Sequence, residues 1–264
     1  MSDSIPRVRM FAGPNGSGKS TVIKGLDDRL SKLFLNADNL EKDLKKIPVL
    51  DLHDFDKRIS PTNLVNFLAN SEKTKKDSEG NKVNEPYLSI PPTIDGSKID
   101  LKSNTIDSYL TAAILDYVRK ELLLLKVSFT FETVMSHESK ITFLRDAKNK
   151  GYRTYLYFIT TEDPDINVDR VRQRVAKGGH PVDEEKIRAR YLRTMDLLID
   201  AIEVSDRAFL FDNSSNKAEG GSYICEITNG DTLTFNPDFI GDLPIWFEDY
   251  VLVHLVPADL NSMD

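Results

Sequence analysis

The 264-residue chain carries 35 basic and 42 acidic side chains, a net charge of −7, and is 40% hydrophobic, as globular rather than disordered or fibrous proteins are. This acidic balance argues against nucleic acid as the main partner, because phosphate binding needs clustered positive charge, and no apolar run approaches the ~20 residues that span a bilayer, so no membrane partner is expected. Such a length permits one large α/β domain or a core with an elaboration.

The amino-terminal segment predicts a strand, a tight loop and a helix. Apolar residues over 8–12 indicate the strand, glycines fill the loop, and apolar residues resume at Val22 and Ile23. A second short strand over 33–35 runs into Asn36-Ala37-Asp38, and a helix is expected from Asn39. Asp38 is therefore predicted at the carboxyl end of a strand.

Residues 71–104 are predicted to be a polar insertion. Over 71–86 eight of sixteen residues are charged and, proline aside, only Val83 is apolar, which indicates an exposed, mobile excursion. Residues 87–104 contain two β-like stretches around Asp95-Gly96, which favours a small hairpin. Apolar residues at helical spacing then predict a helix over 105–125.

The rest of the core alternates between strand and helix, which predicts a mainly parallel, five-stranded sheet covered by helices on both faces. After residue 215 two β-like stretches, 223–228 and 231–235, flank Asn229-Gly230, a dipeptide preferred in two-residue hairpin turns. We expect residues 1–215 to form the core domain and residues 216–264 to pack on it. The predicted core elements are a strand at 127–134, a helix at 137–149, a strand at 152–161, a helix from about Asp163 to Gly178, a helix at 183–204 and a strand at 208–212.

The loop before the first helix matches the P-loop template Gly-x-x-x-x-Gly-Lys-Ser in full. Its glycines let main-chain N–H groups surround an anion, and the helix amino terminus adds partial positive charge. We expect Lys19 to reach the β and γ phosphates of ATP and the Ser20 hydroxyl to help hold Mg²⁺. The expected nucleotide-binding residues are Gly13, Pro14, Asn15, Gly16, Ser17, Gly18, Lys19, Ser20 and Thr21.

Two carboxylates are candidates for the chemistry. Asp38 lies where ligands bind in open α/β folds and is able to accept a proton from an attacking hydroxyl, or else it only caps the next helix. Glu132 interrupts a β-like run. It either hydrogen-bonds a substrate hydroxyl, acts through water on Mg²⁺, or is an exposed strand-end residue.

Nine basic-type side chains lie within the 24 positions 170–193 of this acidic chain. Arg170 and Arg174 are four apart and so share one helix face. Facing a triphosphate, the pair would neutralise charge that develops during transfer. The alternative is a solvated helix face paired with Glu184, Glu185 and Asp196.

The histidines and the cysteine suggest no metal site. His180 follows Gly178-Gly179 at a break between helices, and nothing near the other histidines has ligand spacing. The single Cys225 rules out an internal disulfide and fits a reducing cytosol. Since residues 1–6 also lack the features of a secretory signal, we expect a cytoplasmic protein.

Taken together, these segments resemble the zeta toxin family of P-loop kinases, in the branch often described as predicted ABC-type ATPases. The resemblance covers about residues 7–46 and 108–215, and its specificity lies in the combination of motifs. The motifs are Phe11 to Thr21, Asn36-Ala37-Asp38, Phe131-Glu132-Thr133, Gly178-Gly179-His180 with Arg190-Tyr191, and Asp212-Asn213-Ser214.

The resemblance implies a nucleotide-kinase-like, three-layer α/β sandwich with site residues in defined roles. Asp38 would be the base, Glu132 and Thr133 would touch the acceptor, and lid residues would hold phosphates. Arg170 or Arg174 fits the first lid arginine, and His180 or Arg190 stands for the second. Toxin members phosphorylate UDP-N-acetylglucosamine on a sugar hydroxyl, and by analogy a small helical antitoxin would be a partner.

The expected function is therefore ATP- and Mg²⁺-dependent phosphoryl transfer to a small hydroxyl-bearing acceptor, with a nucleotide sugar favoured. One alternative is an NTP hydrolase for which water is the only acceptor. Another is a nucleotide-binding partner module without catalysis, within a toxin–antitoxin pair.

Overall fold

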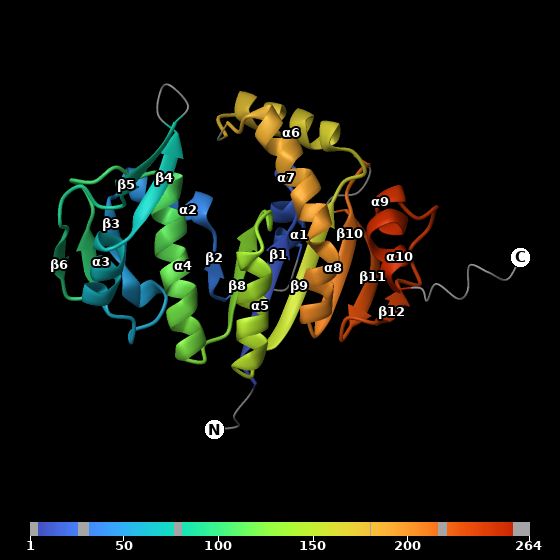
Figure 1. Ribbon diagram of the computed structural model, residues 1–264, viewed down its shortest axis with the longest axis horizontal. Helices are drawn as coiled ribbons and strands as arrows, with labels where there is room; N and C mark the ends of the chain where they lie inside the picture. Colours follow the sequence, from blue (N-terminus) through green and yellow to red (C-terminus); the bar gives the residue numbers. More distant parts are fainter. Residues whose placement is uncertain (1–4, 26–31, 77–80, 180, 216–220, 256–264) are drawn as a thin grey trace, which may run out of the picture. The chain divides into compact units, whose positions relative to one another are not determined.

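The computed structural model describes residues 5–25, 32–76, 81–179, 181–215 and 221–255 (Figure 1). The chain forms two compact units. Met1–Phe34 and Phe129–Asp264 make the first, called here the P-loop unit, and Leu35–Ser128 make the second, the middle unit. The middle unit is wider than the predicted insertion at 71–104, because it also contains the helices on either side of that segment.

The P-loop unit is built on a seven-stranded sheet with the order β12-β11-β10-β9-β1-β8-β2. Neighbours in the series β10-β9-β1-β8 pair in parallel, while β11 and β12 pair antiparallel. All five strands predicted for the core are present, and the predicted hairpin extends the same sheet. The strands are β1 (Arg7–Ala12), β2 (Phe34–Leu35), β8 (Phe129–Thr133), β9 (Arg153–Thr160), β10 (Arg207–Asp212), β11 (Ser222–Thr228) and β12 (Thr232–Phe235).

Both faces of this sheet are covered, which gives three layers (Figure 1). On one face Phe11, Tyr157 and Phe209 stack in a row, with ring centroids 4.5 and 4.9 Å apart, and α1 (Lys19–Lys24) packs there through Val22. On the other face the Thr154 hydroxyl donates to a carbonyl of α8 (Leu198–Val204). Strand residues alternate between faces, so rows of aromatic and aliphatic side chains fill both interfaces.

The helices predicted for the P-loop unit are present with one correction, and the helical elements over 245–255 were not predicted. The helix predicted over 183–204 is two helices, because the chain breaks regular structure at Leu197. The predicted turn also holds: Asn229 and Gly230 have φ values of 55° and 86°, as a type I′ turn requires. The other elements are α5 (Ser139–Asn149), α6 (Pro164–Ala176), α7 (Glu184–Asp196), α9 (Ile245–Phe247), a π-helix (Glu248–Leu252) and α10 (Val253–Leu255).

The middle unit combines helices with two small antiparallel sheets. The predicted hairpin around Asp95-Gly96 is present as β6 and β7 and joins β3. No helix in the described part of either unit is long and apolar enough to cross a membrane. The elements are α2 (Ala37–Lys46), β3 (Val49–Asp51), a 3₁₀ turn (Leu52–Asp54), α3 (Pro61–Ala69), β4 (Glu72–Lys76), β5 (Lys82–Pro86), β6 (Thr93–Asp95), β7 (Lys98–Asp100) and α4 (Ser108–Leu124).

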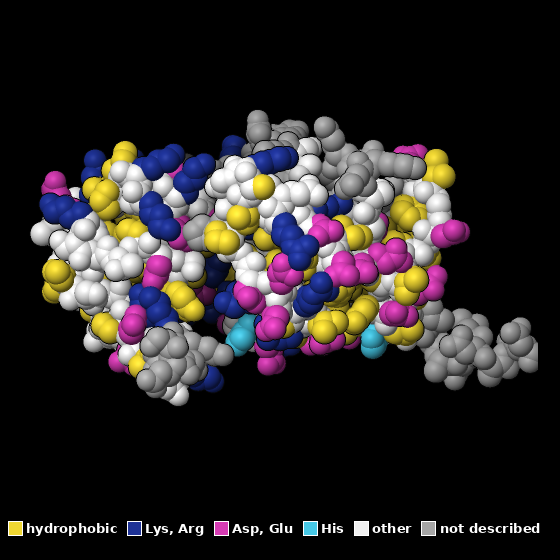
Figure 2. All heavy atoms as spheres, turned by 90° about the horizontal axis from the view of Figure 1, so that it is seen from above, with side chains coloured by type: hydrophobic (Ala, Val, Ile, Leu, Met, Phe, Trp, Pro, Cys, Tyr) yellow, Lys and Arg dark blue, Asp and Glu magenta, His cyan; other side chains and the backbone are white. Residues whose placement is uncertain are grey.

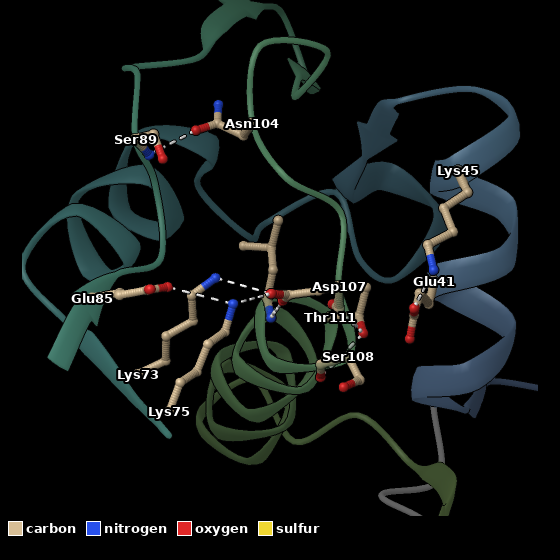
Figure 3. Close-up of polar contacts among 11 residues, drawn as sticks. Glu41, Lys45, Lys73, Lys75, Glu85, Ser89, Asn104, Asp107, Ser108 and Thr111 are labelled. Carbon is tan, nitrogen blue, oxygen red and sulfur yellow. Dashed lines mark hydrogen bonds and ion pairs between the residues drawn. The ribbon is translucent and has the colours of Figure 1, made fainter. Parts of the chain in front are cut away.

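The segment predicted as an exposed excursion, 71–86, contains a hairpin of β4 and β5, of which β5 is exposed along its whole length, as expected. Its charge has a structural partner: the ammonium groups of Lys73 and Lys75 each lie 3.0 Å from the Asp107 carboxylate (Figure 3). Asp107 also caps α4 by accepting a hydrogen bond from Leu110 N at 2.9 Å. One carboxylate therefore links the hairpin to the start of α4. Composition alone does not reveal this link, because the partner lies 34 positions away from Lys73.

Candidate functional site

The loop between β1 and α1 is shaped by positions at which only glycine fits. Gly13, with φ of 145°, lies so close to β9 that a Cβ there would be 1.9 Å from the Ile159 carbonyl oxygen. Gly18, with φ of 91°, is the N-cap of α1, and its Cβ would be 2.1 Å from Asn213 Nδ2. The spacing of the P-loop template therefore corresponds to a close contact with the main chain of β9 and another with the Asn213 side chain after β10.

Lys19 lies across this loop and is buried. Its Nζ donates to the carbonyl oxygens of Gly13 and Pro14, both at 2.9 Å. The Glu132 Oε1 lies 3.9 Å from the same nitrogen, and the two side chains are only 7% and 15% exposed. The ammonium group thus lies between the loop and the end of β8, next to a carboxylate.

The Ser17 hydroxyl offers a polar group within the loop. It is fully buried, and among the described residues it has no hydrogen-bond partner. A buried hydroxyl without a partner is costly, and a bound anion would satisfy it. Together with Lys19 and the glycine main chain, this hydroxyl makes the loop fit a phosphate-bearing ligand.

Two asparagines hold the loop from outside. Asn213, just after β10, donates from Nδ2 to the Ser17 carbonyl at 2.8 Å. Asn167, on α6, donates from Nδ2 to the Asn15 carbonyl at 2.7 Å and accepts from the Thr161 hydroxyl. The cap of α6 is Asp163, and the sequence analysis did not identify Asn167 as a site residue. No local pattern marks this role, because it depends on main-chain contacts that the fold creates.

The basic residues of α6 and α7 divide into two groups. Arg170 donates to the Asn213 carbonyl at 2.7 Å, and Arg190 donates to Asn15 Oδ1 at 3.3 Å. Arg190 thus contacts the loop itself, and Arg170 contacts the asparagine that is bonded to the loop. Burial lowers the pKa of Arg170, and the nearby Asp212 opposes that shift. Arg174 is exposed, although it shares a helix with Arg170.

Other basic residues of these helices form exposed ion pairs, as the alternative of a solvated helix face predicts. Arg172 pairs with Asp169 and Glu184, and Arg188 pairs with Asp165, all at exposed positions. Figure 2 shows Lys, Arg, Asp and Glu side chains side by side on one face of the molecule. The dense run of arginines is therefore partly a surface feature and partly attached to the loop.

The Glu132–Thr133 pair ends β8 beside Lys19 and leads into a constrained turn. Met135 has a φ of 59°, and its N–H donates to the Thr133 hydroxyl at 3.2 Å. On α7 the Thr194 hydroxyl donates to the Val134 carbonyl at 3.0 Å. The helix that carries Arg190 thus also fixes the turn after Glu132. Sequence reasoning missed Thr194.

Two further predicted site residues are Asp38 and His180. Asp38 belongs to the middle unit and is exposed in the first turn of α2. It is not the cap, because Asn36 accepts the capping bond from Asn39 N at 2.9 Å. Accordingly α2 begins at Ala37 rather than at the predicted Asn39. His180 lies outside the described residues.

The predicted metal ligand, Ser20, is exposed in the first turn of α1, next to Thr21. Across the described ranges no three His, Cys, Asp or Glu side chains form a group suited to a metal ion. Any Mg²⁺ at this loop would therefore depend on oxygens of the bound phosphates as well as on Ser20.

A comparison with solved structures bears on the fold. No family model matches the chain. An uncharacterized protein of Haemophilus influenzae is 32% identical over 65 residues, which is 25% of this chain and 46% of that protein. A structure from the PezAT chromosomal toxin–antitoxin system of Streptococcus pneumoniae superposes with a TM-score of 0.50 at 14% identity, covering 96% of this chain and 86% of that one.

A second structure, AvrRxo1-ORF1:AvrRxo1-ORF2 with sulphate ions, has a TM-score of 0.46 at 15% identity and covers 89% of this chain and 62% of that one. The PezAT likeness, at its low identity, concerns the fold, and it coincides with the strand order and the glycine-rich loop described above. The chain therefore has an α/β fold like that of the PezAT structure, with a P-loop between β1 and α1.

Proposed function

We propose that this protein is a kinase that binds ATP at the loop 13–18 and transfers the γ-phosphate to a hydroxyl group of a small acceptor. One observation carries the proposal: the buried ammonium of Lys19 lies against the loop carbonyls with Glu132 3.9 Å away. Phosphoryl transfer relies mainly on positioning and charge neutralisation, and this loop supplies both.

Each residue around the loop has its own proposed role in binding or transfer. Lys19 exchanges its carbonyl partners for phosphate oxygens, and the N–H groups of the loop surround the anion. Arg170 and Arg190 come from two different helices and neutralise charge that develops on the transferred group. Ser20 would help to hold Mg²⁺, which would supply positive charge against the phosphates. Arg174, being exposed, is a secondary candidate.

Asp38 is proposed as the base that accepts the proton of the acceptor hydroxyl. Its exposed position in the first turn of α2 leaves the carboxylate accessible to a substrate hydroxyl. Glu132 and Thr133, at the end of β8, are proposed to contact the acceptor, as the resemblance to the zeta toxins implies. His180 remains a candidate for the second lid position.

The favoured acceptor is a nucleotide sugar such as UDP-N-acetylglucosamine. This choice rests on the resemblance of the Asn36-Ala37-Asp38 and Phe131-Glu132-Thr133 segments to those of the toxins. The PezAT protein is part of a toxin–antitoxin system, so a small helical antitoxin is the proposed protein partner.

The test is a transfer assay with γ-labelled ATP and Mg²⁺, run with UDP-N-acetylglucosamine and with a metabolite extract. A kinase moves label into a sugar nucleotide or another metabolite, and the Lys19→Ala variant does not. Release of inorganic phosphate at one rate with or without acceptors would instead identify a hydrolase. If calorimetry finds no binding of Mg·ATP, the nucleotide site itself is wrong.

A further inference from the structure

A tryptophan of the carboxyl-terminal segment is linked to the P-loop through the turn that contains Asp212 and Asn213. Trp246, on α9, is 2% exposed and donates from its indole N–H to Asp212 Oδ1 at 3.0 Å. It packs against Phe158 of β9 and at a right angle on Phe247. The indole is therefore held in place by packing and directs its N–H at one carboxylate.

Asp212 organises the turn that follows β10. The Ser214 hydroxyl donates to its Oδ1 at 2.6 Å, and the Ser214 N–H donates to its Oδ2 at 3.1 Å. The Ser214 hydroxyl in turn accepts from Glu162 N at 2.8 Å. The carboxyl-terminal segment attaches to the same place a second time, since Ile245 N donates to Glu162 Oε1 at 3.2 Å. Hydrogen bonds to a charged acceptor are stronger than neutral ones, so this turn has little freedom.

Between Asp212 and Ser214 lies Asn213, the residue that holds the loop. Its side chain donates to the Ser17 carbonyl, and its own carbonyl accepts from Arg170. Asp212 also acts electrostatically on Arg170, because its charge opposes the effect of burial on that guanidinium. A shift of the 212–214 turn would thus displace both the loop and a proposed phosphate-binding arginine.

We infer that Trp246 is a positioning residue of the nucleotide site, which it influences through Asp212 and Asn213. The carboxyl-terminal segment 245–255 is then a structural component of that site rather than an appendage. This inference rests on the proposed function, because it requires that the loop binds a nucleotide.

The first test separates the hydrogen bond from the packing. Trp246→Phe keeps an aromatic ring but removes the N–H, whereas Phe129→Leu weakens packing between buried rings without touching Trp246 or Asp212. Affinity for a non-hydrolysable ATP analogue with Mg²⁺ is measured by calorimetry, and the thermal midpoint is measured alongside. We expect Trp246→Phe to raise Kd by about three- to tenfold and Phe129→Leu to lower the midpoint while leaving Kd unchanged. Equal Kd values for Trp246→Phe and the wild type, or an equal rise in both variants, would overturn the inference.

The second test uses the wild-type protein and needs no folded variant. Trp246 is the chain's sole tryptophan, so its fluorescence reports this one position. The emission should change along the same titration curve that calorimetry gives for the analogue. Calorimetric saturation with no change in emission contradicts the inference and leaves the proposed function intact. Absence of calorimetric binding, in contrast, removes the proposed function and the inference with it.

Discussion

The side-chain amide of Asn213 donates a hydrogen bond to the main-chain carbonyl of Ser17 at 2.8 Å, across 196 positions of sequence. This bond joins the end of β10 to the middle of the P-loop and is buried. Because Arg170 donates to the same asparagine, the loop and a proposed lid arginine have a common anchor. The conformation of the phosphate-binding loop therefore depends on a residue far from the motif that identifies it.

Removing this anchor should loosen the loop. We expect Asn213→Ala to lower the free energy of unfolding by about 1–3 kcal/mol, the usual effect of losing a buried hydrogen-bond partner, and to weaken ATP binding. Asn236→Ala is the matched control, since it removes a similar amide bond, to the Tyr223 carbonyl at 3.0 Å, away from the loop. Denaturation and calorimetry measure the two effects. Equal ATP affinity in both variants would show that Asn213 does not act on the loop.

A methyl group at Gly18 should be far more harmful than one at Gly178. Both glycines have positive φ, 91° and 84°. Alanine disfavours this left-handed conformation, so either substitution should destabilise the fold by about 1–2 kcal/mol. A Cβ at Gly18 would also lie 2.1 Å from Asn213 Nδ2, which is a steric clash. At Gly178, in contrast, no atom of the described residues lies within 4 Å of the added Cβ. Gly18→Ala should abolish nucleotide binding and Gly178→Ala should retain it. Retention of binding in both would mean that the loop is less tightly held than described.

The chain's single cysteine should be inert while the protein is folded. Cys225 is buried, and burial raises the pKa of its thiol to about 12. Only the thiolate reacts with a disulfide reagent, so we expect no modification at pH 8 until denaturant is added. The folded state disfavours the thiolate, so stability present below pH 9 should decline as the pH rises from 9 towards 12. Rapid modification without denaturant would contradict this burial.

The β4–β5 hairpin should depend on the charge of Asp107. Asp107→Asn keeps a capping side chain for α4 but leaves the 4%-exposed Lys73 without its anion (Figure 3). Because Asp107 itself is 21% exposed, the free energy of unfolding should fall by less than the roughly 3–5 kcal/mol that breaking a fully buried ion pair costs. Asp100→Asn, whose partner Lys102 is 72% exposed, should change the free energy of unfolding far less than Asp107→Asn does. Chemical denaturation compares them, and equal losses would refute the link.

The ion pairs of Asp107 with Lys73 and Lys75 also predict how the free energy of unfolding depends on pH. Burial opposes ionisation of Asp107, but the Leu110 N–H and the two lysines outweigh it, so the pKa of this carboxyl is lowered. A lowered pKa in the folded state means that the stabilisation is present above the usual aspartate range and is lost as the pH falls below it. Unfolding curves recorded at falling pH should therefore converge for the wild type and Asp107→Asn.

Asp38 provides the sharpest test of the proposed base. Asp38→Asn should lower the transfer rate by about 10²- to 10⁴-fold, the range for loss of general-base catalysis, with little change in the Kd for Mg·ATP. Asp43, also exposed on α2, gives the control Asp43→Asn, which should transfer at the wild-type rate. Transfer by Asp38→Asn at that same rate would exclude the base role.

The parallel core was predictable because its signals are local. Alternating apolar runs located the strands, and Asn229-Gly230 located the turn of the last hairpin. The loop 13–18 was likewise evident from spacing. What sequence could not provide were the partners: Asn167 and Thr194 act through main-chain contacts that only the fold creates. The β4–β5 hairpin was hidden for the same reason, since its lysines pair with a distant carboxylate.

The most direct measurement of the central claim is the mass of the acceptor after incubation with the protein and Mg·ATP. The account predicts that UDP-N-acetylglucosamine, or one component of a metabolite pool, gains a single phosphoryl group on a hydroxyl. It also predicts that Lys19→Ala yields none. ATP consumed at the same rate with no acceptor gaining mass in any pool would contradict it.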